Sequence, residues 1–133
     1  MTDTYVYIIH EADWNSDQWL PGAPVPEGAA EQDPDMGFPA HKAFQDAVAA
    51  LGARITGGQA LQNSRHGGTV KPGDGDRKVE DAVYTDGPFT DTAEVITGFY
   101  MVETSDEDTA RRIAAMVPSG GHVEWRKVFP TGA

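Results

Sequence analysis

The sequence predicts a rigid turn that carries one acidic side chain. Asp86 is followed by Gly87 and Pro88, so the turn combines a side chain that can bond its own backbone, a residue free to adopt positive φ and a residue with fixed φ. An apolar run at residues 95–103 follows closely. We therefore expect chemistry at this bend, although a tight turn also favours Asp for structural reasons alone.

The other reactive residue types narrow the chemistry. The chain has no cysteine, which excludes disulfides, thiolate nucleophiles and cysteine-ligated metal centres. The glycines form neither a Gly-x-Gly-x-x-Gly fingerprint nor a Walker motif, so we expect no nucleotide cofactor. We also expect no metal site, because no metal-ligand spacing connects the four histidines, which are His10, His41, His66 and His122.

Patterns of apolar residues predict the elements that position these groups. A first helix begins near Pro39 and stops at Gly52, and His41 falls on the edge of its apolar stripe. A second helix begins with the N-cap pattern at Ser105 and ends before Pro118. Strands are expected at residues 5–9, 53–61, 95–103 and 122–129, and a β-hairpin at 69–71 and 79–85.

This order of elements predicts one α+β domain over residues 1–133. Without the hairpin it is the βαββαβ plan of a ferredoxin-like sandwich, with both helices on one face of an antiparallel sheet. The strand at 95–103 carries branched or aromatic residues on both of its alternating faces. Because helices cover one face, we expect a second sheet from another copy to cover the other, and we predict a homodimer.

An irregular acidic loop is predicted at about residues 11–37. From Glu11 to Asp35 there are seven acidic residues, no Lys or Arg, and four prolines that break helices. Trp14 and Trp19 lie within this loop, and a wholly disordered segment would rarely carry two tryptophans. They are either a flap over a pocket or two anchors that pin the loop to the domain.

The charge balance argues against two classes of partner. The chain has 10 Lys and Arg against 21 Asp and Glu, for a net charge of −11, which repels phosphate backbones and anionic membranes. We therefore expect neither nucleic-acid nor membrane binding. The first residues lack a basic region, and their apolar run is too short for a signal segment or a membrane span, so a cytoplasmic location is expected.

Several motifs resemble one protein family. The run from Asp86 to Phe89, the following Asp91-Thr92-x-Glu94 and the segment Gly98-Phe99-Tyr100 resemble the DGPF-motif branch of the YCII-related proteins. The likeness extends less closely to Gly57-Gly58-x-Ala60-Leu61, to residues 123–128 and to an opening strand, and it leaves out residues 11–37. The chain departs from this branch at Ala93, where relatives usually carry Lys.

This resemblance implies a fold and a site. YCII-related proteins are α/β sandwiches whose sheets pair in a dimeric barrel, and a His in their first helix with a nearby Asp forms the active site. His41 matches that His, but Ala53 stands where some relatives carry the Asp, so Asp86 would take its place. The carboxylate would orient the imidazole and raise its pKa. The expected substrate-binding residues are Gly58, Gly87, Pro88, Phe89, Trp14 and Trp19.

Three classes of function remain open. The first is an enzyme that uses His41 and Asp86 for acid–base chemistry on a small molecule, of the isomerase or lyase kind. The second is a non-catalytic small-molecule-binding or regulatory module, because members of the family often lie beside genes for extracytoplasmic-function sigma factors. The third is a purely structural role. A histidine at the edge of a helix is more often an ordinary half-buried residue than a catalyst.

Overall fold

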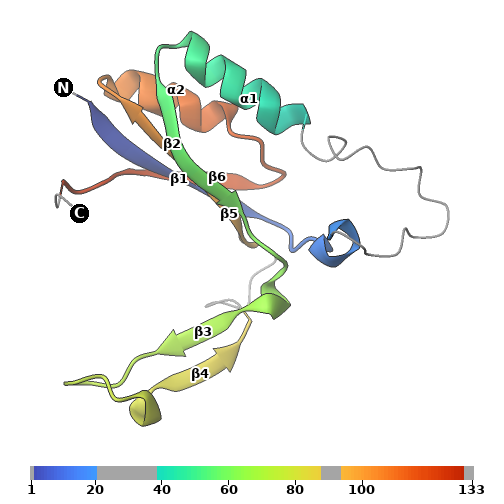
Figure 1. Cartoon of the computed structure of the whole chain (residues 1–133), viewed down its shortest axis with the longest axis vertical. Helices are drawn as coiled ribbons and strands as arrows, with labels where there is room; N and C mark the ends of the chain where they lie inside the picture. Colours follow the sequence, from blue (N-terminus) through green and yellow to red (C-terminus); the bar gives the residue numbers. More distant parts are fainter. Residues whose placement is uncertain (1, 21–38, 88–93, 131–133) are drawn as a thin grey trace.

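The computed structural model describes residues 2–20, 39–87 and 94–130 (Figure 1). Pro88, Phe89, most of the predicted acidic loop and the side chain of Trp19 lie outside this description. The fold is mixed α/β, with one four-stranded sheet and two helices. None of the helices in the described part of the chain is long and apolar enough to cross a membrane.

The main sheet is antiparallel throughout, in the order β2-β5-β1-β6. Its two central strands are also its longest, because their branched and aromatic residues suit an extended chain with neighbours on both sides. The helices and strands predicted from the sequence are all present. The strands are β1 (Asp3–Glu11), β2 (Arg54–Ala60), β5 (Val95–Thr104) and β6 (His122–Lys127), and the helices are α1 (Pro39–Ala50) and α2 (Glu107–Met116).

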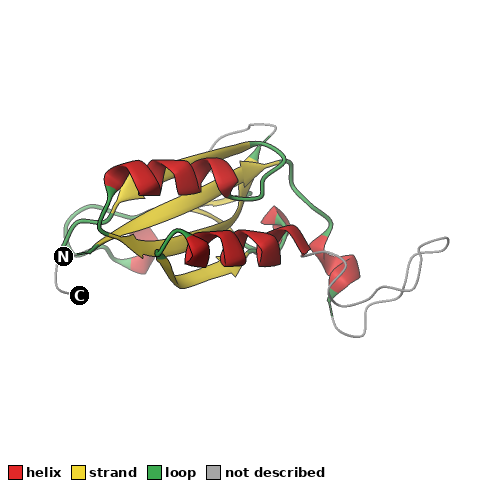
Figure 2. Cartoon of the chain, turned by 90° about the horizontal axis from the view of Figure 1, so that it is seen from above, coloured by secondary structure: helices red, strands yellow, loops and turns green. Residues whose placement is uncertain are grey.

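Both helices pack on the same face of this sheet (Figure 2). Alternate residues of β1 point to that face, so Tyr5, Tyr7 and Ile9 are buried while the residues between them are not. Phe44 of α1 and Ile113 of α2 complete the core. A fully buried tyrosine needs a partner for its hydroxyl group, and that of Tyr7 donates to the carbonyl oxygen of Ala110 at 2.7 Å.

Three predicted boundaries need correction. Asp106, and not Ser105, is the N-cap of α2, because its carboxylate accepts a hydrogen bond from the Asp108 backbone nitrogen at 3.1 Å. Glu11 belongs to β1 and not to the acidic loop, where a 3-10 turn, η1 (Ser16–Trp19), also forms. The second hairpin arm starts later than predicted, because the 3-10 turn η3 (Val79–Asp81) precedes its strand.

The second face of the main sheet carries apolar side chains without a covering layer from the described elements. These side chains alternate with the core residues along the two central strands and are half-buried in the single chain. They include Val6 and Ile8 of β1 and Phe99 and Met101 of β5. The expectation that apolar residues line both faces of β5 is therefore met.

The inserted hairpin forms a separate two-stranded sheet, made of β3 (Gly68–Lys71) and β4 (Val83–Asp86). It extends away from the main sheet on the side opposite to the helices (Figure 1). Its apolar side chains are exposed to an unusual degree, since Val83 and Tyr84 have 60% and 66% of their surface accessible.

Candidate functional site

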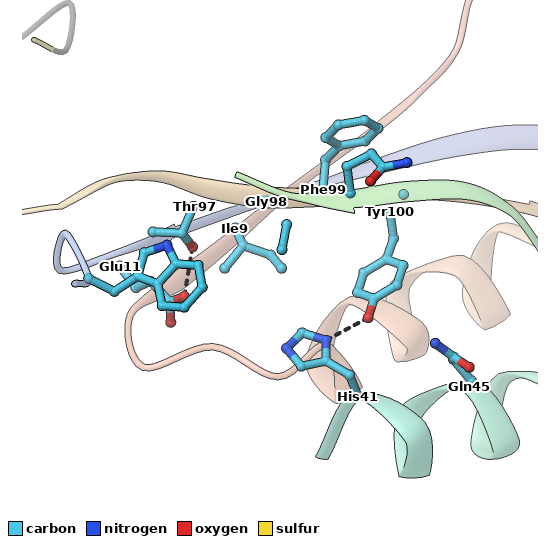
Figure 3. Close-up of a pocket in the computed structure, with 12 residues that line it drawn as sticks. Ile9, Glu11, His41, Gln45, Thr97, Gly98, Phe99 and Tyr100 are labelled. Carbon is cyan, nitrogen blue, oxygen red and sulfur yellow. Dashed lines mark hydrogen bonds between the residues drawn. The ribbon is translucent and has the colours of Figure 1, made fainter. Parts of the chain in front are cut away.

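A pocket of about 420 Å³ lies between the start of α1 and the main sheet (Figure 3). His41 and Gln45 line it from α1, while Glu11 lines it from the end of β1. Trp14 contributes from the segment that follows β1, and β2 and β5 supply the rest of the lining. Each of these groups comes from a different part of the sequence, and the antiparallel sheet brings them together.

The pocket exists because small residues lie side by side on the helix-facing side of the sheet. Gly98 pairs with Ala60 of β2, and Gly58 pairs with Tyr100 of β5. A Cβ atom at Gly98 would lie 2.9 Å from the Gln59 carbonyl oxygen, which is too close for a real contact. The absence of side chains here leaves a space beneath α1 that larger residues would fill.

Tyr100 is held by α1. Its hydroxyl oxygen lies 2.5 Å from Nδ1 of His41, and its ring packs on Phe44 with 4.8 Å between centroids. Gln45, one helical turn after His41, hydrogen-bonds the same tyrosine side chain. Figure 3 shows the tyrosine side chain pointing from β5 toward His41. The helix and the strand are therefore joined by a polar contact at the wall of the pocket.

Burial keeps both partners of this contact uncharged. It lowers the pKa of His41, and the nearby Glu11 carboxylate opposes that shift. It also raises the pKa of Tyr100, against an opposing effect of the hydrogen bond from Gln45. Since Gln45 donates to the tyrosine oxygen, we assign the phenolic proton to the bond with Nδ1 of His41, and the imidazole proton to Nε2.

Glu11 is the carboxylate that accompanies His41 in the pocket. One of its oxygens accepts a hydrogen bond from the Thr97 hydroxyl group at 2.6 Å, and the other accepts from the Gly120 backbone nitrogen at 2.8 Å. Two donors from separate elements thus fix its orientation. Figure 3 shows the Glu11–Thr97 contact on the far side of the pocket from Tyr100.

Trp14 is both an anchor and a part of the pocket wall. Its indole Nε1 donates to the carbonyl oxygen of Leu61 at 2.9 Å, so its position relative to β2 is fixed. The residues after it are tied to the same region, because the Ser16 hydroxyl oxygen accepts from the Asn63 backbone nitrogen at 2.8 Å. Asp17 adds a hydrogen bond with His66, with 2.6 Å between Oδ1 and Nε2.

The structure brings together some of the predicted site residues and not others. His41, Gly58 and Trp14 all line the pocket. Asp86 does not line it and is exposed at the end of β4, where Gly87 adopts a φ of 85° as a tight turn requires. The pairing of His41 with Asp86 stays a prediction, and the pKa shift of His41 is downward where that pairing implies an upward one.

Sequence reasoning missed the residues that surround His41. The spacing could have identified Gln45, because a polar residue four positions after His41 must lie on the same side of α1. Tyr100 lies in an apolar run, which predicts a core residue and not a polar contact. Glu11 lies at the boundary of the predicted acidic loop, so its place at the end of a strand is not expected. In the described ranges, no three His, Asp or Glu side chains gather as a metal ion would need.

Comparison with known protein families matches residues 24–131 to the YCII-related domain. The chain belongs to the YCII-related family. The matched part of this YCII-related protein includes His41, Gly58 and Tyr100, but it leaves out residues 1–23, which contain β1 and Trp14. Glu11 and Trp14 are therefore contributed by residues outside the family match. No curated protein matches this chain.

The pKa of His41 makes stability depend on pH in a defined direction. A histidine whose folded pKa lies below its ordinary 6.5 binds fewer protons when folded than when unfolded. Above pH 6.5 the imidazole is neutral in both states, so it does not reduce the free energy of unfolding. As the pH falls from 6.5 toward the folded pKa, the unfolded state binds the proton first, and the folded state loses stability. We expect His41→Gln to weaken this loss, as measured by urea unfolding between pH 5 and pH 8. An identical pH dependence in the two proteins would contradict it.

Proposed function

We propose that this YCII-related protein is a small-molecule enzyme that uses acid–base chemistry, of the isomerase or lyase kind, in the pocket beneath α1. The observation that carries the proposal is the convergence of His41, Tyr100 and Glu11 on one pocket, where the Tyr100 hydroxyl group contacts the imidazole. Perturbed titratable groups that converge on a cavity are typical of active sites. A volume of about 420 Å³ suits a small organic molecule.

The three side chains take complementary roles. His41 transfers the proton, because an imidazole with a pKa below its usual value is available as a base at neutral pH. Exchange with solvent takes the proton from Nε2 and returns one to Nδ1, which then donates to the Tyr100 hydroxyl oxygen and leaves a lone pair on Nε2. Glu11 stabilises the imidazolium that forms when the proton is taken up. Tyr100 and Glu11 are positioning residues in this scheme.

A screen for hydrogen exchange tests the proposal without a known product. A base that removes a proton from carbon returns deuterium from D₂O, so a substrate gains mass when incubated with the protein. We expect protein-dependent deuterium uptake or conversion for at least one compound in a mixture of small metabolites, as measured by mass spectrometry. Ligands that bind without exchange or conversion would favour the alternative, a non-catalytic binding or regulatory module.

We also propose a ferredoxin-like topology, membership of the DGPF-motif branch and a dimeric barrel. The strand order β2-β5-β1-β6, with both helices on one face, supports a ferredoxin-like sandwich. The run from Asp86 to Phe89 supports membership of the DGPF-motif branch. The apolar second face of the sheet supports a dimeric α/β barrel, in which a second copy of the chain covers that face.

The dimer gives a prediction with a matched control. Sedimentation at micromolar concentration should give about twice the chain mass of 14.3 kDa. Ile8→Lys places a charge on the second face of the sheet and should reduce the mass to that of one chain, because a buried unpaired charge is costly. Leu51→Lys adds the same charge at the end of α1, where the leucine is 44% exposed, and should leave the dimer intact. A parent protein that sediments as a single chain would contradict the barrel.

A further inference from the structure

The described lining of the pocket contains an acidic side chain, Glu11, and no Lys or Arg. Burial favours the neutral forms of His41 and Tyr100, and the other polar side chains at the wall are amides and a threonine hydroxyl group. An anionic ligand would therefore meet a carboxylate and no compensating cation.

The described Lys and Arg residues all lie outside the lining of the pocket. The segments outside the described residues contain no Lys or Arg, but they contain five acidic residues. Lys42 follows His41 on α1, but it is exposed and does not line the pocket, because successive helical residues point about 100° apart. Five other cations are held in ion pairs with acidic side chains, namely Arg54, Arg65, Arg112, Arg126 and Lys127.

Glu11 is fixed in a way that leaves it able to accept more hydrogen bonds. A carboxylate offers about four lone-pair sites. The described contacts, from Thr97 and from the Gly120 backbone nitrogen, use one site on each oxygen. The carboxylate is thus held in place by the protein and retains acceptor capacity for N–H donors of a ligand.

The wall of the pocket adds aromatic surface. Trp14 is held by the bond from its indole nitrogen to Leu61, and Tyr100 is held by α1. Aromatic faces attract organic cations and also pack well on an apolar body. A fixed carboxylate and fixed aromatic rings in the wall of one pocket suit an ammonium group on a small hydrophobic frame.

We propose that the ligand of this pocket is a small organic cation, a protonated amine whose ammonium group bonds to Glu11 and whose apolar body packs on Trp14. This inference names a substrate class for the proposed function. It rests on that proposed function because both assign the ligand to the same pocket. It places the amine in the pocket that His41 also lines. Carboxylic acids and phosphate esters are excluded as ligands by the same charges.

Three probes of similar shape test the charge preference on the unaltered protein. They are the phenethylammonium ion, 2-phenylethanol and 3-phenylpropionate, and binding is followed by NMR through the indole N–H of Trp14. We expect the ammonium ion to bind about 10- to 100-fold more tightly than the alcohol, because a hydrogen bond to a charged group is worth more than a neutral one. We expect no binding of the carboxylate.

Two variants separate the pocket from the general charge of the protein. Glu11→Gln should remove the preference for the ammonium ion over the alcohol while leaving the binding of the alcohol unchanged. Asp46→Asn removes an exposed charge from α1 outside the pocket and should leave the preference intact. An unchanged preference in Glu11→Gln, an equal loss in Asp46→Asn, tighter binding of the carboxylate or no binding of the ammonium ion would each overturn the inference.

The enzyme proposal and this inference fail in different ways. If amines bind through Glu11 but no compound exchanges deuterium or is converted, the ligand class stands and the enzyme proposal is wrong. If an anionic compound is converted in a reaction that needs His41, the enzyme proposal stands and the ligand class is wrong.

Discussion

Replacing His41 with Gln is expected to lower the rate of deuterium exchange or turnover about 10²- to 10⁴-fold, the range that general acid–base catalysis supplies. The amide can still hydrogen-bond the Tyr100 hydroxyl group, so the wall of the pocket should keep its shape. The loss should therefore lie in the chemical step and not in binding. Mass-spectrometric exchange rates and ligand dissociation constants, measured on the same preparations, separate the two.

His122→Gln is the matched control for this prediction. That histidine is exposed and pairs with Glu94 outside the pocket, with 2.8 Å between Nδ1 and Oε2. The same chemical change there should leave the exchange rate within about twofold, as expected for a surface substitution. Tyr100→Phe should give an intermediate loss, because the imidazole would lose the partner that sets its tautomer. Equal rates for His41→Gln and the parent protein would remove His41 from the mechanism.

The second large effect is expected at one of two adjacent glycines. A Cβ atom at Gly58 would lie 2.8 Å from the carbonyl oxygen of Phe99 and 2.9 Å from Cδ1 of Tyr100. Gly58→Ala should therefore destabilise the fold by about 1–3 kcal/mol, the usual cost of overpacking. It should also displace the ring that contacts His41, so the binding of any ligand should weaken. Urea unfolding and ligand titration measure the two effects.

Gly57→Ala provides the comparison within the same strand. The nearest atom to a Cβ there is the sulfur of Met101 at 3.8 Å, an ordinary contact. The substitution should be neutral, or stabilising by about 0.4–1 kcal/mol through the lower entropy of the unfolded chain. If Gly57→Ala and Gly58→Ala had equal free energies of unfolding, the close contacts at Gly58 would not explain why a glycine is needed there.

The sequence predicts the framework of the fold better than the surroundings of the site. Helical periodicity places His41 at the edge of an apolar stripe, and the structure finds it at the rim of the core beside Phe44. Strand alternation predicts two apolar faces for β5, and both are present. These features depend on local spacing, which the sequence contains directly.

The partner of His41 depends on tertiary geometry that local spacing does not contain. Asp86 lies at the end of β4, and the hairpin that carries it extends to the side of the sheet opposite to the helices. Glu11 reaches the pocket because β1 lies beside β5, where Thr97 bonds its carboxylate. The hydrogen bond between Glu11 and Thr97, which lie 86 positions apart in the sequence, fixes the acid that lines the pocket together with the histidine.

The anchoring of Trp14 shows a similar limit. Its sequence context left a flap and an anchor as alternatives; the structure shows the anchoring bond to Leu61 and places the side chain in the pocket lining. The composition of a loop indicates that a tryptophan is docked, but the surface that receives it comes from the end of β2 and the residues after it. Such contacts between distant segments follow from the folded topology.

An NMR titration of the His41 imidazole, in the parent protein and in two variants, tests the central claim most directly. In the parent the pKa should lie below 6.5, because burial outweighs the effect of Glu11. Glu11→Gln should lower the pKa further, since it removes the carboxylate that favours the charged imidazole, whereas Asp86→Asn should leave the curve unchanged. A pKa above 6.5 in the parent that falls in Asp86→Asn and not in Glu11→Gln would contradict the account and assign the partner of His41 to the hairpin.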